Sequence, residues 1–100
     1  MNFYVYLICA KKNDRSLISY VGYTKNIKKR LCAHNSSKGA KFTRGKQWKL
    51  LYTKKFNSKN EAMKYEYKLK KDTQKRKLLK LRFWYETSKD NSYNRFTSKT

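Results

Sequence analysis

Three short stretches of this chain are apolar and rich in β-branched and aromatic residues, and polar segments separate them, which is typical of strands. The three strands are predicted at residues 3–10, 17–23 and 48–56. A polar stretch at 11–15 connects the first two, so we expect them to form a hairpin. Side chains alternate between the faces of a strand. If Tyr6 and Tyr20 share a face of the hairpin, two phenols meet at one point.

Helical periodicity is present on both sides of the third strand. The first helix is predicted to run from a cap at Thr24 or Asn26 to about Asn35. Its apolar stripe is flanked by Arg30 and His34, which are therefore expected to point toward the rest of the protein instead of toward water.

The second helix follows the third strand and starts at a capping box formed by Ser58 and Glu61. Its apolar face is predicted to carry Ala62, Met63 and Leu69. Glu66 falls in the middle of that face. Beyond Asp72 the chain is strongly basic, and its leucines and aromatic residues can continue as a further helix packed on the sheet.

The order strand, strand, helix, strand, helix predicts an α+β fold, with a small three-stranded, mainly antiparallel sheet flanked by helices and a C-terminal helical extension. A chain of 100 residues is long enough for one domain with a modest core. We expect this single domain to span residues 1–86, including the basic extension. A polar, flexible tail is expected at 87–100.

The charge of the chain narrows the class of partner. Lysine and arginine number 27 and aspartate and glutamate number 6, which gives a formal net charge of +21. Such a chain favours a polyanion, because each phosphate that a cation neutralises releases counterions. Nucleic acid is favoured over a membrane surface, because no segment pairs a basic face with a continuous apolar face. No stretch approaches the length of a membrane span.

The basic residues that we expect to contact nucleic acid lie in the first helix and the loop after it, and in the chain from the second helix onward. They are Lys25, Lys29, Lys41, Arg44, Lys46, Lys70, Lys71, Lys75 and Arg76.

The cysteine content bears on the compartment. Cys9 and Cys32 cannot form a zinc site alone and have no CxxC spacing, and a disulfide framework is not expected from two cysteines. We therefore expect an intracellular protein in a reducing compartment, the cytoplasm or the nucleus, acting as a monomer or a weak homodimer.

Glu66 is the most informative single residue. A carboxylate on the apolar face of a helix loses its water, which is unfavourable unless the carboxylate binds a cation. Two interpretations have equal weight from the pattern alone: a metal ligand, or a structural ion pair with Arg30 or a lysine.

Four other side chains are candidates for chemistry. Arg30 and His34 are four residues apart and therefore neighbours on one helix face, where an arginine can hold a phosphate and a histidine can transfer a proton. Taken alone, His34 is better explained by a chance position on a basic helix. Tyr6 and Tyr20, taken alone, are better explained by packing, because the chain is rich in tyrosine and a phenol with a pKa of ~10 is a poor base near neutral pH.

In this order, the residues resemble the GIY-YIG nuclease family. The first motif is present as Val5-Tyr6-Leu7 and the second as Tyr20-Val21-Gly22. Arg30 and His34 stand where the family has its helix arginine and its frequent histidine, and Glu66 stands where it has its helix glutamate. Any one tripeptide is a weak signal, but the ordered set is a strong one.

The resemblance covers about residues 3–72 and is closest to the compact subgroup that includes the Slx1-type structure-selective endonucleases and small uncharacterised bacterial relatives. It implies the GIY-YIG nuclease fold. It also implies hydrolysis of a DNA phosphodiester by water with one divalent ion, Mg²⁺ or Mn²⁺.

The resemblance assigns roles to five catalytic residues. Glu66 would hold the metal ion, and Arg30 would stabilise the charge of the transition state. Tyr6, rather than Tyr20, is favoured as the base that takes a proton from water, with the other phenol orienting that water. His34 would bind the phosphate or relay a proton.

The chain departs from the family pattern at several positions. Val5 replaces the first glycine and Leu7 an isoleucine, and Tyr23 stands where many members have a relay lysine, a role that His34 or Lys25 would have to take. The asparagine that several members carry after the second helix has no clear equivalent. The two cysteines cannot supply the RING-type zinc domain with which Slx1-type proteins dock a scaffold partner.

The function expected from the sequence is therefore a metal-dependent DNA endonuclease. No separate sequence-reading module is evident, so we expect it to select branched or nicked DNA by shape, in repair or recombination. The alternative is a non-catalytic basic nucleic-acid-binding protein. The net charge suits both, but the alternative gives no reason for Glu66 on an apolar helix face.

Overall fold

The computed structural model describes residues 2–14 and 16–82 and has the predicted α+β architecture. In chain order the elements are β1 (Phe3–Lys11), β2 (Leu17–Thr24), α1 (Ile27–Asn35), the 3₁₀ turn η1 (Lys41–Thr43), β3 (Lys49–Phe56) and α2 (Lys59–Lys71). A further helix starts at residue 73 and continues to residue 82, the last described position. The predicted order of strands and helices, with the C-terminal helical extension, is confirmed.

The three strands form one antiparallel sheet in the order β2-β1-β3, so the central strand is the most apolar one. The hairpin register pairs Tyr6 with Gly22 and Ile8 with Tyr20. Tyr6 and Tyr20 therefore lie diagonally on the same face of the sheet, as neighbours in two adjacent strands.

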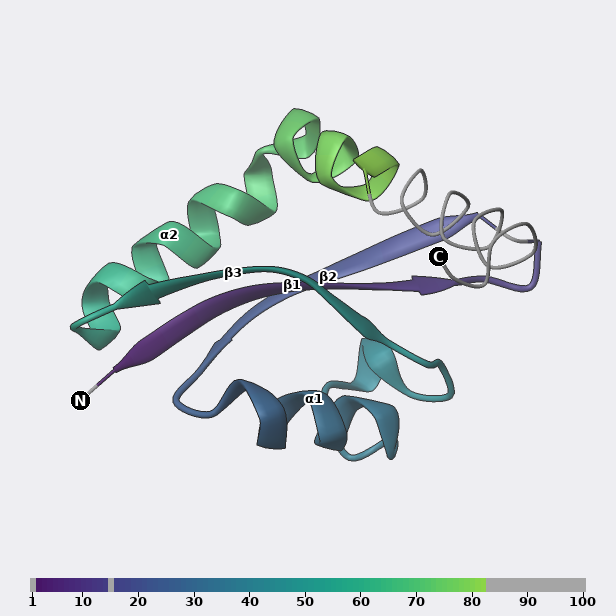
Figure 1. Ribbon diagram of the computed structural model, residues 1–100, viewed down its shortest axis with the longest axis horizontal. Coiled ribbons are helices and arrows are strands. Elements are labelled where there is room, and N and C mark those ends of the chain that lie inside the picture. Colours follow the sequence, from purple (N-terminus) through teal and green to yellow (C-terminus); the bar gives the residue numbers. More distant parts are fainter. Residues whose placement is uncertain (1, 15, 83–100) are drawn as a thin grey trace, which may run out of the picture.

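The helices cover opposite faces of the sheet, with α2 on one side and α1 on the other (Figure 1). The buried residues of the α2 side are Val5, Leu7, Val21, Ala62 and Leu69. The buried residues of the α1 side are Tyr6, Ile8, Ala10 and Trp48. The tyrosine motif thus belongs to the α1 face, while the next residue along each strand packs under α2.

Both helices start at the caps that the sequence predicts. The Asn26 side chain accepts a hydrogen bond from the backbone of Lys29, and the Ser58 side chain accepts one from the backbone of Glu61. The prediction that Met63 belongs to the apolar face of α2 was wrong, because its side chain is 44% exposed. The side chains that face the sheet recur at i, i+3, i+4 and i+7 from Ala62, and Met63 lies about 100° away from that stripe.

Some predictions fall on the remaining residues. The predicted end of the domain at residue 86 and the tail at 87–100 lie outside the described residues, as do the aromatic residues at 83–85. Among the residues that are described, no helix is long and apolar enough to cross a membrane. Cys9 and Cys32 are both free, the first buried and the second exposed.

Candidate active site

The hydroxyl of Tyr6 lies directly over the backbone of Gly22 in the neighbouring strand. A Cβ atom at Gly22 would come within 2.5 Å of that oxygen, so any larger residue would push the phenol away. The glycine of the second motif is therefore needed for space. Tyr6 is 3% exposed, and burial, the largest effect, raises the pKa of its phenol.

A chain of hydrogen bonds on the α1 face fixes the proton positions around Tyr6. His34, which is 0% exposed, has its Nε2 2.8 Å from the Tyr6 hydroxyl and its Nδ1 2.8 Å from Thr43 Oγ1. Thr43 donates its single hydroxyl proton to the Ala40 carbonyl at 2.8 Å. Thr43 Oγ1 must then accept from Nδ1–H, so the Nε2 of neutral His34 is the acceptor and Tyr6 donates to it.

Arg30 holds the other side of the Tyr6 hydroxyl. Its Nε donates to that oxygen at 3.4 Å, from one turn before His34 in α1. This bond is the main reason why the pKa of Arg30 is raised, so the guanidinium stays charged. Burial, followed by the charge of Arg30, lowers the pKa of His34, so its imidazole stays neutral at neutral pH.

Tyr20 completes the aromatic wall of the site. Its ring centroid is 5.2 Å from that of His34 and 6.5 Å from that of Tyr6. Tyr20 also lines a hollow of about 270 Å³ on β2, opposite the side chains of Lys70 and Arg76. This hollow places Tyr20 beside two cations that belong to α2 and the helix after it.

Glu66 belongs to α2, which covers the other face of the sheet. Its side chain is 18% exposed, and its charge is one of the smaller contributions that raise the pKa of Tyr6, after burial and the nearby Tyr20. Its carboxylate is 3.5 Å from the Lys70 amine, which is itself half exposed. Exposed pairs of this spacing contribute only about 0.3–0.5 kcal/mol, so the carboxylate can exchange this partner for a metal ion.

The donor set at Glu66 fits a hard divalent ion. Within the described residues, no three His, Cys, Asp or Glu side chains come together, so the protein would supply one carboxylate here. Magnesium retains several waters and is commonly bound through one or two carboxylates, whereas a structural zinc site needs four protein ligands.

Residues 2–80 match the GIY-YIG catalytic domain. The chain belongs to the GIY-YIG family. It therefore carries a nuclease domain of that family, as the ordered motifs predict.

The relatives are small bacterial GIY-YIG proteins. A UPF0213 protein of Oceanobacillus iheyensis is 48% identical over 68 residues, which are 67% of this chain and 74% of the relative. A UPF0213 protein of Streptococcus agalactiae is 46% identical over 74 residues, 73% of this chain and 82% of the relative. The solution structure of a UPF0213 protein from Bacillus halodurans is 42% identical, covers 81% of this chain and 85% of that one, and has a TM-score of 0.41.

Four of the cations predicted to contact nucleic acid lie beside Tyr20 or at the ends of η1, whose Phe42 stacks on Tyr20. Lys70 and Arg76 line the hollow beside Tyr20. Lys41 and Arg44 are exposed at the two ends of η1. Arg76 also donates to the last carbonyls of α2, which holds its guanidinium in place.

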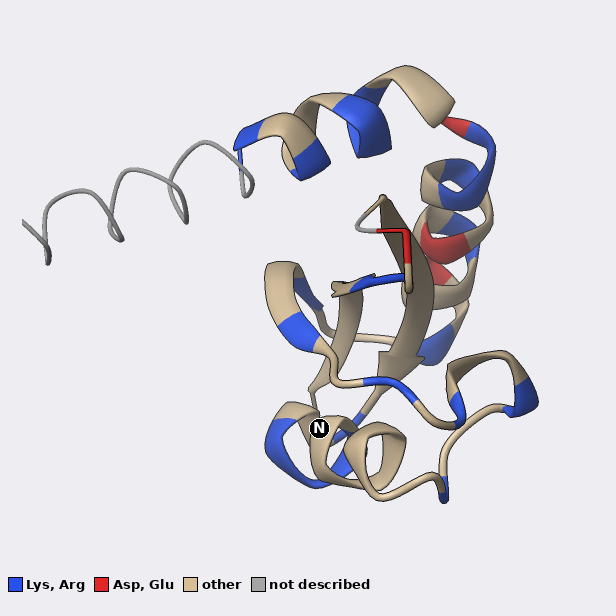
Figure 2. Ribbon diagram, turned by 90° about the vertical axis from the view of Figure 1, so that its right-hand side faces the viewer, with Lys and Arg blue, Asp and Glu red and all other residues tan. Residues whose placement is uncertain are grey.

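The other predicted cations lie farther around the sheet. Lys25, Lys71 and Lys75 each lie over an aromatic ring. Lys29 is exposed on the outer side of α1, and Lys46 lies in the loop before β3. Figure 2 shows Lys and Arg on all the helices and the connecting loops, whereas the acidic residues of the described part lie on α2, at its end and in the hairpin turn.

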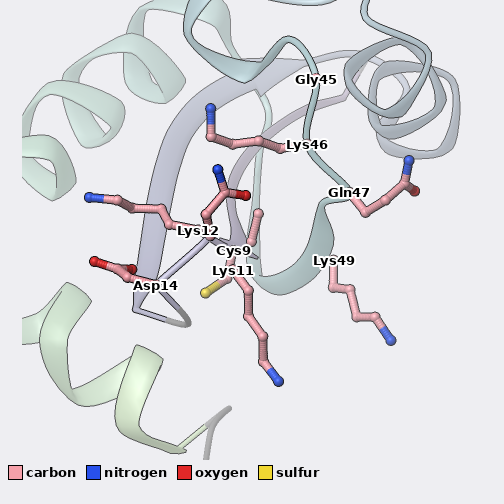
Figure 3. Close-up of a pocket in the computed structure, with 10 residues that line it drawn as sticks. Cys9, Lys11, Lys12, Asp14, Gly45, Lys46, Gln47 and Lys49 are labelled. Atoms are coloured by element: carbon pink, nitrogen blue, oxygen red, sulfur yellow. The ribbon is translucent and has the colours of Figure 1, made fainter.

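The largest of the hollows described lies at the hairpin tip, where its lining on β1 begins at Cys9, three residues or about 10 Å from Tyr6. It measures about 820 Å³ and lies between the turn at 11–14 and the loop at 45–47. Figure 3 shows that the lysine side chains around it point in different directions. Such an arrangement suits an extended polyanion better than one small ligand.

Two residues of this GIY-YIG site were not predicted from the sequence. Thr43 fixes the tautomer of His34, as described above. Gly39 packs against the imidazole so closely that a Cβ atom there would collide with it. Positive φ occurs at Gly45 and not at Gly39, so Gly39 is needed for space. The available signal was a glycine in a polar loop five residues after the only histidine.

Proposed function

We propose that this GIY-YIG domain is a metal-dependent DNA endonuclease. Water hydrolyses a phosphodiester bond of the DNA, and the Tyr6 hydroxyl acts on that water. The observation that carries the proposal is the position of the Tyr6 hydroxyl, held between the charged guanidinium of Arg30 and the acceptor nitrogen of His34. A packing tyrosine has no need of a neutral histidine fixed in one tautomer.

The attacking water loses its proton through two coupled transfers. One water proton passes to the Tyr6 oxygen as the Tyr6 proton passes to His34 Nε2, which leaves hydroxide at the phosphate and an imidazolium at His34. The neutral state of His34 supports this direction, and Thr43 Oγ1 keeps the imidazolium hydrogen-bonded at Nδ1. His34 would thus replace the relay lysine of other family members. Tyr23, which occupies that position, packs on the α2 side of the sheet.

The phosphate is held by cations on two elements. Arg30 approaches from α1 and stays charged throughout, so it can stabilise the negative charge that develops in the transition state. Lys70 and Arg76 approach the hollow at Tyr20 from the other side. The strand that is cut would therefore cross the edge of the sheet at β2.

Glu66 would hold one divalent ion, Mg²⁺ or Mn²⁺. When bound, such an ion neutralises the phosphate and the leaving 3′ oxygen. Lys70 would then be released from its long ion pair with Glu66 and become free to contact the phosphate.

The substrate is proposed to be branched or nicked DNA, in repair or recombination. The cations of the described residues are spread over several elements instead of lining one groove-reading helix, which supports recognition of shape over sequence.

A cleavage panel tests the function. Flap, fork, four-way and linear duplex substrates are incubated with Mg²⁺, with wild type and Glu66→Gln. Glu61→Gln is the matched control, because Glu61 is an exposed residue of the same helix. We expect wild type and Glu61→Gln to cut branched substrates, and Glu66→Gln to bind DNA without cutting.

Excess EDTA should also stop cleavage. Cutting by Glu66→Gln or in EDTA would refute the metal-dependent mechanism. Binding without cleavage by wild type would favour the alternative, a non-catalytic nucleic-acid-binding protein, for which the net charge of +21 is sufficient.

A further inference from the structure

Phe42 presents a large aromatic ring to solvent beside the candidate site. Its side chain is 55% exposed. One face of the ring stacks on Tyr20, with centroids 6.2 Å apart and an interplanar angle of 22°. Single exposed apolar residues are common in proteins, so the exposure alone carries no conclusion. The conclusion depends on how the ring is held and on what surrounds it.

The turn that carries Phe42 is fixed on both sides of the ring. Thr43 is fully buried and bonded to His34 through its side chain. The Trp48 indole donates to the Thr43 carbonyl at 2.8 Å, and the Trp48 ring lies 6.3 Å from Phe42. The ring is therefore held in its exposed position before any ligand arrives, which lowers the entropy lost on binding.

The surroundings of the ring are cationic. Phe42 lines the 270 Å³ hollow together with Tyr20, Lys70 and Arg76. An exposed aromatic ring flanked by lysine and arginine is the arrangement that proteins use to stack a nucleobase while contacting the phosphates on either side. An apolar protein partner would instead require a continuous apolar surface, which these two cations interrupt.

We propose that Phe42 stacks an unpaired nucleobase next to the phosphate that is cut. This inference rests on the proposed function and specifies its substrate class: DNA in which a base beside the cleavage site is unstacked, as at a flap, a junction or a frayed nick. In continuous duplex the same base must first leave the stack, which is unfavourable.

Binding without cleavage tests this inference separately from catalysis. Glu66→Gln protein, without metal, is titrated with a labelled single-stranded oligonucleotide and with a duplex of the same length. Adding Phe42→Ala should weaken single-strand binding by about 5- to 100-fold, the effect of losing one stacked base, and duplex binding by less than about 2-fold. A fluorescent base analogue in the single strand should be quenched in the complex with Phe42 and less so without it.

Two further variants make the result specific. Phe42→Leu keeps an apolar side chain against Tyr20 but has no planar ring, so it should lose the same single-strand preference. It takes the place of Phe42→Ala if that variant proves unfolded. Lys41→Met removes an adjacent exposed cation and should weaken both substrates to a similar extent, because phosphate contacts do not depend on base stacking.

Equal loss on both substrates, or no loss in Phe42→Leu, would overturn the stacking proposal. If wild type fails to cleave any DNA while the binding difference is present, the nuclease proposal fails and the stacking site stands.

Discussion

Two groups of tyrosines lie on opposite faces of this sheet and make the same kinds of contact. On the α1 face, the Tyr6 hydroxyl is 2.8 Å from His34 Nε2 and accepts from Arg30. On the α2 face, the Tyr52 and Tyr65 hydroxyls are 2.7 Å apart, and Lys75 donates to Tyr65 at 3.1 Å. Each group thus pairs a phenol with a close hydrogen-bond partner and a cation.

The two groups differ in what the partner can accept. His34 is a neutral base with its Nε2 lone pair directed at Tyr6, whereas the partner of Tyr52 is another phenol, which cannot take a proton near neutral pH. Burial is also the main reason why the pKa of Tyr52 is raised. A short hydrogen bond and a nearby cation are therefore not enough to identify a catalytic tyrosine. The phenol must also face an acceptor that can take its proton, as the Nε2 of neutral His34 can.

Removing one hydroxyl from each group gives the largest expected contrast. Tyr6→Phe should lower single-turnover cleavage by about 10²- to 10⁴-fold, the usual contribution of a positioned acid or base. Tyr52→Phe should change it by less than about 3-fold, because its hydroxyl only bonds other side chains of the α2 face. Both variants are measured at saturating enzyme with Mg²⁺ on the best branched substrate.

Thermal melting of both variants is the control, since a folded Tyr6→Phe protein is needed to interpret the rate. An equal loss of cleavage in the two variants would remove the distinction between the two faces and with it the assignment of Tyr6 as the base.

The fold and the residues that contact the Tyr6 hydroxyl could be predicted from the sequence, because they depend on local rules. Strand alternation places Tyr6 and Tyr20 on one face, and spacing on a helix places Arg30 beside His34. Caps at Asn26 and Ser58 set where the helices begin. These features are determined by residues close together in the chain.

The residues that contact His34 from the loop could not be predicted, because their positions depend on how an irregular loop folds back. Thr43 meets His34 only after the loop at 36–45 has closed over the imidazole, and no periodicity governs that loop. Phe42 was missed for the same reason. Met63 was misplaced because an apolar residue beside the buried stripe looks like a member of it until the helix phase is known.

The buried hydroxyl of Thr43 should contribute more to the free energy of unfolding than the Tyr65 hydroxyl on the α2 face. Thr43→Val keeps the shape but leaves His34 Nδ1–H without an acceptor in a dry site, which should cost about 1–3 kcal/mol. For a domain of this size, each kcal/mol corresponds to a fall of about 4–8 °C in Tm. Tyr65→Phe removes a partly exposed hydroxyl and should lower Tm by only a few degrees.

Thr43→Val should also slow cleavage, because His34 is no longer held in the required tautomer, while Tyr65→Phe should not. If the two variants melt alike and cleave alike, the His34–Thr43 bond has no special role.

The smallest expected effect is on the pH dependence of stability. Because burial, followed by the charge of Arg30, lowers the pKa of His34 in the folded state, the unfolded chain binds this proton first as the pH falls below about 6.5. Stability should therefore decrease on acidification from about pH 6.5 down to the folded pKa, by at most about 1.4 kcal/mol per pH unit. The pKa of Lys75 shifts in the opposite direction from that of His34. Its raised pKa, due first to the Tyr65 hydroxyl, concerns only alkaline pH.

His34→Gln cannot titrate, so the difference between its denaturant-unfolding free energy and that of wild type should shrink steadily from pH 7 to pH 5. Asp14 has a lowered pKa through its hydrogen bonds with Ser16 and also destabilises the fold in acid, but it does so equally in both proteins and cancels from the difference. A difference that stays constant with pH would contradict the lowered pKa of His34. A difference that grows on acidification would mean that the folded protein binds this proton before the unfolded chain does, and that His34 is charged in the folded protein. In that case Nε2 donates to Tyr6 instead of accepting from it, and the proposed proton transfer runs in the wrong direction.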